Sequence, residues 1–162
     1  MLSTGENKAY KAREVAEFIV AQYHDYVTYE RGLDLTIYRL HALLYFSQVY
    51  FVTRHDKRLF EDDMAAWTCG AVVPEISLRY RIFGGNRIRL NYDEGFTTPI
   101  TEKDQEEIMK VILSLEDYHT FDLIDIILMQ TPWREAKERT RVRIDGTYPG
   151  IVKIEDIKEF FK

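Results

Sequence analysis

The feature that most constrains the fold is a helix-length run, LTIYRLHALLYFSQVYF, within residues 35–75. Apolar residues recur in it at the helical spacings of three, four and seven and also fill the remaining sides: Ile37, Leu40, Leu43, Leu44, Phe46, Val49, Tyr50 and Phe51. A surface helix keeps a polar face, whereas a helix that is apolar nearly all round belongs in the middle of a core. We therefore predict a buried central helix that ends near Thr53.

The run that follows, LFEDDMAAWTCGAVVPE, contains Trp67, Gly70 and Pro74 within eight residues. Glycine permits backbone angles that other residues resist, and proline favours the start of a helix. The sequence therefore predicts a specialised turn near residue 70, entered by a short strand or extended passage at 64–68, with a helix beginning at Pro74.

The rest of the chain indicates a single domain over residues 8–162, preceded by a disordered lead at 1–7. We expect helices at 8–29, 75–83, 121–129, 133–139 and 155–161, and another after Thr101. Thr120 and Thr131 are the expected N-caps of two of them, and Gly32 is the expected C-terminal cap of the first. In the last helix we expect Ile157 and Phe160 to pack in the core. Alternating patterns predict strands at 87–92 and 141–144, with turns at Asp145-Gly146 and Pro149-Gly150. The predicted fold class is mainly α (α+β), a compact helical domain around the central helix with a small antiparallel sheet at most.

The charge pattern is uneven. A formal net charge of −5 and a pI near 5.4 argue against attraction of nucleic acid by the whole surface. One short run is nevertheless basic with no acid in it: Arg79, Arg81, Arg87 and Arg89. Such a run is usually a solvated face, but it can also provide electrostatic complementarity to a protein partner. We predict these four arginines as partner-binding residues, because arginine is enriched at interfaces.

The sequence contains no recognisable catalytic or metal-binding motif. The four histidines form no metal-binding pair, and His41 on the central helix is predicted to be a partly buried, hydrogen-bonded residue rather than a ligand. Cys69 beside Trp67 is expected to be a small buried apolar group rather than a reactive thiol. The acidic run at 61–63 resembles an exposed turn more than a cation site. We therefore expect no enzyme activity, no cofactor and no metal.

A single cysteine excludes an internal disulfide and favours a reducing cytoplasm. No apolar run reaches the length of a membrane span, and the N-terminal residues lack the apolar segment of a signal peptide. We expect a cytoplasmic protein with no membrane partner.

Several segments, taken in order, resemble the Panacea domain of SocA-like antitoxins, a family also described as phage-associated proteins. The central run LTIYRLHALLYFSQVYF is similar to the family's Leu- and Tyr-rich helix, and LFEDDMAAWTCGAVVPEI is similar to its Ala-Trp-x-x-Gly-Pro-Val-Val-Pro segment. The stretch at 131–136, Thr-Pro-Trp-x-x-Ala, and the closing apolar helix extend the resemblance over most of the chain. The matching residues that we assign to the structural motif are Trp67, Gly70, Val72, Pro74, Pro132 and Trp133.

The resemblance implies an antitoxin that neutralises a cognate protein toxin, encoded by an adjacent gene, through direct contact. Two alternatives also act by binding: an adaptor that delivers a toxin or other protein to a cellular protease, and a phage-associated interaction protein without a toxin partner. A nucleic-acid binder using the 79–89 run is a further alternative, and the acidic pI argues against it.

Overall fold

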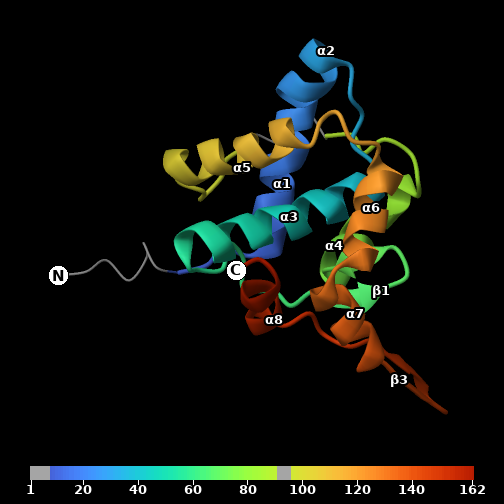
Figure 1. Ribbon diagram of the computed structural model, residues 1–162. Coiled ribbons are helices and arrows are strands. Elements are labelled where there is room, and N and C mark those ends of the chain that lie inside the picture. The colour runs from blue at the N-terminus through green and yellow to red at the C-terminus, as the bar shows by residue number, and fades with distance from the viewer. Residues whose placement is uncertain (1–7, 91–95) are drawn as a thin grey trace.

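The computed structural model describes residues 8–90 and 96–162, and the predicted disordered lead at 1–7 lies outside them. Helix α3 (Ile37–His55) runs through the middle of the molecule, and most of its side chains are buried (Figure 1). Thr36 caps it, since the hydroxyl accepts a hydrogen bond from the Arg39 N–H at 3.3 Å. The predicted buried central helix is therefore confirmed, and it continues two residues beyond Thr53.

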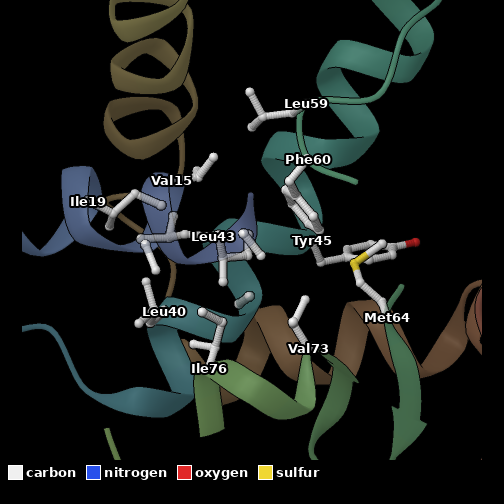
Figure 2. Close-up of a cluster of buried hydrophobic side chains, with 14 of the residues drawn as sticks. Val15, Ile19, Leu40, Leu43, Tyr45, Leu59, Phe60, Met64, Val73 and Ile76 are labelled. Carbon is white, nitrogen blue, oxygen red and sulfur yellow. The ribbon is translucent and has the colours of Figure 1, made fainter. Parts of the chain in front are cut away.

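The first helical segment crosses α3 and supplies much of the core. It consists of α1 (Ala12–Gln22), a π-helical turn η1 (Tyr23–Val27) and α2 (Thr28–Arg31). Gly32 ends it in the left-handed conformation (φ 68°), as predicted for a C-cap glycine. Val15 and Ile19 of α1 face Leu40 and Leu43 of α3 in the buried cluster of Figure 2.

Further helices surround α3 (Figure 1). They are α4 (Pro74–Arg79), the 3-10 turn η2 (Arg81–Phe83), α5 (Glu102–Ser114), α6 (Thr120–Met129), α7 (Thr131–Glu138) and α8 (Ile154–Phe160). Proline opens α4 at its first turn, as the sequence predicted. Each helix is too short to be stable alone, so its position depends on the apolar face that it buries against the core.

Two antiparallel hairpins complete the fold. Strand β1 (Ala65–Trp67) pairs with β2 (Gly70–Val72), and β3 (Arg141–Arg143) pairs with β4 (Gly146–Tyr148). The first pair lies against α3, α6 and α7, and the second extends away from the helices (Figure 1). The predicted α+β class is confirmed, with the small sheet realised as two separate two-stranded sheets.

Several local predictions were wrong. Residues 87–90 form no strand: Ile88 is buried and donates one backbone hydrogen bond to Leu35 O, but no second strand lies alongside, and residues 91–92 are outside the described part. Thr120 and Thr131 are the first residues of their helices rather than the caps, which are His119 and Gln130. The Thr120 hydroxyl instead accepts a hydrogen bond from the buried Arg39 side chain.

Two predictions near the C-terminus also need correction. The tip of the β3–β4 hairpin is Ile144-Asp145, and Gly146 already belongs to β4. Its φ of 145° explains the glycine there. Phe160, which we expected to pack in the core, is 43% exposed, whereas Ile157 of the same helix is fully buried.

His41 is buried, at 4% exposure, and its Nδ1 has no hydrogen-bond partner among the described residues. The hydrogen bond expected for this histidine is therefore absent at Nδ1. Burial lowers the pKa of His41 to about 4, because desolvation penalises the charged imidazolium.

This lowered pKa predicts a pH-dependent stability. The unfolded chain takes up the proton near pH 6.5 and the folded chain only near 4, so stability present above 6.5 is lost as the pH falls through this window. We expect the free energy of unfolding to decrease by about 2 kcal/mol between pH 7 and pH 5 from this residue. Urea unfolding at both pH values measures the change. His41→Leu should remove most of it, and an unchanged pH dependence in that variant would contradict the assignment.

Gly150 marks a close approach between the segment after β4 and helix α7. A Cβ built there would lie 1.8 Å from the Ala136 carbonyl oxygen, so no larger residue fits without moving backbone. We expect Gly150→Ala to lower the free energy of unfolding by about 3 kcal/mol. Gly85→Ala is the matched control, because its Cβ would meet only a Tyr38 ring carbon at 3.7 Å. Equal stability of the two variants in thermal unfolding would argue against this packing.

Candidate functional site

The two most distinctive motifs of the sequence meet at one tryptophan. Trp133, in the first turns of α7, donates its indole N–H to both Trp67 O at 3.0 Å and Gly70 O at 3.1 Å. These carbonyls belong to the residue pair that closes the β1–β2 turn. One side chain therefore fixes the turn to α7, and we call this arrangement the tryptophan clamp.

The clamp continues inward to the central helix. Gln130, the N-cap of α7, accepts a hydrogen bond through Oε1 from the Tyr45 hydroxyl at 2.6 Å, and both side chains are buried. Pro132 is buried within the first turn of α7. Helix α7 is thus held by α3 at its start and by the β1–β2 turn along its side.

The turn itself has the residues that its geometry needs. Gly70 has a φ of 128°, a conformation that residues with a Cβ rarely adopt. Val72 is fully buried, and Pro74 is exposed where it opens α4. Cys69 lies in the tight turn and is half-buried rather than fully buried. Burial raises the pKa of its thiol, which makes it a weak nucleophile at neutral pH.

The four predicted partner-binding arginines follow this turn, and all four are exposed. Arg79 forms an ion pair with Glu17 of α1 at 2.7 Å, and Arg87 forms one with Asp34 at 3.4 Å. Arg81 and Arg89 have no ion-pair partner in residues 8–90 and 96–162. The structure therefore separates the run into two paired and two unpaired guanidinium groups.

The run also divides in space. Arg87 and Arg89 line a concavity of about 540 Å³ together with Tyr29 and Leu35. Arg79 and Arg81 lie instead on α4 and η2, where two apolar side chains are exposed: Leu78 at 61% and Ile82 at 85%. We call Leu78, Arg79, Arg81 and Ile82 the α4–η2 surface.

Sequence reasoning missed the apolar part of this surface. Leu78 follows the buried Ile76 by two positions, about 200° around a helix, so a helical wheel started at Pro74 would have placed it outside. Phe121, in the apolar helix α6, is also 67% exposed, with its ring centre 5.8 Å from that of Tyr38.

The acidic run at 61–63 supports local structure. Asp62 accepts a hydrogen bond from the Ala12 N–H at 2.7 Å, at the start of α1. Glu61 and Asp63 form ion pairs with Lys11 and Arg58. Over residues 8–90 and 96–162, no group of three or more His, Cys, Asp or Glu side chains is placed to hold a metal ion.

These features define a helical domain whose two motifs join at the tryptophan clamp. The chain matches the family described as "Antitoxin SocA-like, Panacea domain" over residues 40–134, from the first turn of α3 to the residue after Trp133. This match covers more than half of the chain, and the protein therefore belongs to the SocA-like Panacea family. Neither the curated proteins nor the solved structures compared with the chain include a match to it.

Among the described residues, no helix has both the length and the apolar character needed to cross a membrane.

The clamp predicts a specific role for the indole N–H. We expect Trp133→Phe to lower the free energy of unfolding by about 1–2 kcal/mol, because two backbone carbonyls lose a shared donor while the aromatic ring remains. Chemical denaturation measures the loss. Trp67→Phe is the matched control, since the Trp67 indole N–H has no hydrogen-bond partner in the described part of the chain, and it should cost less than about 1 kcal/mol. A larger loss for the control would contradict the clamp.

Proposed function

We propose that this protein is the antitoxin of a toxin–antitoxin pair and neutralises a cognate protein toxin by direct binding. The observation that carries the proposal is its membership in the SocA-like Panacea family, over the region that contains the tryptophan clamp. In this proposal the protein acts in the cytoplasm as a binding protein rather than as an enzyme.

The exposed surface supports the proposal. Arg81 and Arg89 are free of internal ion pairs in the described part of the chain, so their charges are available to an acidic partner without first breaking a contact. Leu78 and Ile82 add apolar area that a partner can bury. We propose the α4–η2 surface together with Arg87 and Arg89 as a toxin contact.

The test is co-expression of this protein with the product of the gene beside its own. We expect that product to arrest growth alone, and growth to be restored when this protein is present. The two proteins should copurify in a fixed ratio. The amount of toxin should be unchanged by the antitoxin, because the proposed mechanism is blocking. A fall in toxin level that depends on a cellular protease would instead support an adaptor.

An interface variant completes the experiment. Arg81→Glu with Arg89→Glu should weaken the complex by about tenfold or more, because charge reversal opposes an acidic partner. Lys103→Glu with Arg54→Glu is the matched control, since both residues are exposed and lie on α5 and at the end of α3. A toxic neighbour that the wild-type protein neither binds nor neutralises would contradict the proposed function.

A further inference from the structure

The β3–β4 hairpin extends from the body of the molecule beyond α7 (Figure 1). All six of its strand residues are exposed. Val142 is 80% exposed, and Ile144 at the tip is fully exposed. A two-stranded hairpin is at best marginally stable in water, and exposed β-branched side chains on it add no packing. This hairpin therefore presents strand-forming apolar groups that the fold itself does not use.

The root of the hairpin is nevertheless held firmly. Gly150, just after β4, is pressed against the Ala136 carbonyl of α7 and accepts a backbone hydrogen bond from Ala66 of β1 at 2.9 Å. Its N–H donates to the Thr140 hydroxyl at 3.1 Å, just before β3. Both ends of the hairpin are thus attached to α7 and to the clamped β1–β2 turn. Its direction is set by the framework even though its own side chains are in solvent.

The two faces of the hairpin differ in chemistry. The register pairs Arg141 with Tyr148 and Val142 with Thr147, so Arg141, Arg143 and Tyr148 share one face and Val142 and Thr147 the other. The Arg143 guanidinium lies 5.8 Å from the centre of the Tyr148 ring. One face is therefore basic and aromatic, and the other is uncharged.

The basic face continues into a concavity of about 650 Å³ at the foot of the hairpin. Its lining includes four cations and one acid: Arg139, Arg141, Arg143, Lys153 and Asp145. Asp145 accepts a hydrogen bond from the Tyr148 hydroxyl at 2.7 Å, and Arg139 forms an ion pair with Asp156 at 3.7 Å. The other three cations have no ion-pair partner in residues 8–90 and 96–162. The lining is thus net positive in a protein whose net charge is −5.

We propose that the β3–β4 hairpin docks an acidic β-strand of the protein partner, which adds to an edge of the hairpin and places its carboxylates on the basic face. This inference rests on the proposed antitoxin function and assigns the toxin a second contact. A two-stranded sheet has backbone N–H and C=O groups along its outer edges that an added strand can pair. Side chains of the added strand that point to the uncharged face would lie beside the exposed Val142.

Charge distinguishes this occupant from a second copy of the chain. Two copies pairing through β3 would bring Arg141 and Arg143 opposite or diagonal to the same arginines, and like charges across strands are destabilising. An acidic strand would instead meet opposite charges at the same positions. Charge complementarity therefore favours a different protein over self-association.

The hairpin lies outside the part of the chain that matches the family. The family match ends at residue 134, and the hairpin begins at Arg141. The clamp thus lies within the shared family region, and the hairpin lies beyond it. A partner contact on the hairpin would therefore lie outside the matched region, on an element held by a framework inside it.

The experiment compares binding of the adjacent-gene product to wild-type protein and to Arg141→Glu with Arg143→Glu. We expect the double variant to bind about tenfold or more weakly, with the wild-type affinity falling as salt is raised. Hydrogen exchange of the wild-type complex should show slower exchange for the backbone amides of residues 141–148. Lys103→Glu with Arg54→Glu carries the same change in charge and should bind as wild type does.

Each contrary outcome has a distinct meaning. Wild-type binding that is retained by the hairpin variant, or unchanged exchange at 141–148, overturns the hairpin contact and leaves the antitoxin proposal standing. Absence of any wild-type complex overturns both. A concentration-dependent dimer lost in the hairpin variant, measured by sedimentation, or a gel shift of single-stranded RNA lost in it, would overturn the acidic-strand assignment. Thermal unfolding checks that the variant is folded, and its exposed positions predict little change in stability.

Discussion

Connections that lie against a buried helix lose the water that would otherwise satisfy their backbone, so the helix must supply hydrogen bonds itself. Two side chains of helix α3 do this for the backbone, and a third, Tyr45, binds a side chain instead. Gln48, fully buried, accepts from the N–H groups of Leu59 and Phe60 and donates to Phe60 O. Arg39 donates to carbonyls between α5 and α6, and Tyr45 donates to Gln130 at the start of α7. Each polar side chain fixes a different connection, and the neighbouring helices are positioned by these contacts as well as by apolar burial.

The candidate site depends on the third of these contacts. Tyr45 fixes Gln130, and Gln130 caps the helix that carries Trp133. The Trp133 indole then holds the β1–β2 turn, from whose end Pro74 starts α4. The α4–η2 surface and the hairpin root are therefore both attached to the core through the same short series of hydrogen bonds. A partner that binds either surface meets a preorganised backbone, which lowers the ordering cost of association.

The sequence predicted well the elements whose patterns are set by local spacing. The apolar period of α3, the left-handed Gly32 and the proline at the start of α4 all follow from rules that act within a few residues. The predictions were wrong where the local structure depends on a residue that is distant in sequence. Thr120 is the first residue of its helix rather than the cap, and its hydroxyl accepts a hydrogen bond from Arg39, which lies 81 residues earlier. The alternation at 87–90 correctly placed Ile88 inside, but a strand also needs a neighbour, which periodicity cannot supply.

The same distinction explains why the contact surface was harder to find than the framework. Buried positions can be predicted because apolar residues recur with the period of a helix or strand. The sequence does not show which exposed arginines form ion pairs within the fold and which do not. Glu17 and Asp34, which are distant in sequence, form ion pairs with Arg79 and Arg87. Arg81 and Arg89 therefore remain available to a binding partner. The exposed apolar residues of the hairpin are harder still to predict from the sequence. Val142 and Ile144 bury almost no surface, so they can be substituted at little cost to the stability of the fold. A change of such exposed side chains would leave the clamp and the core intact, so this fold can accommodate a different partner at low cost.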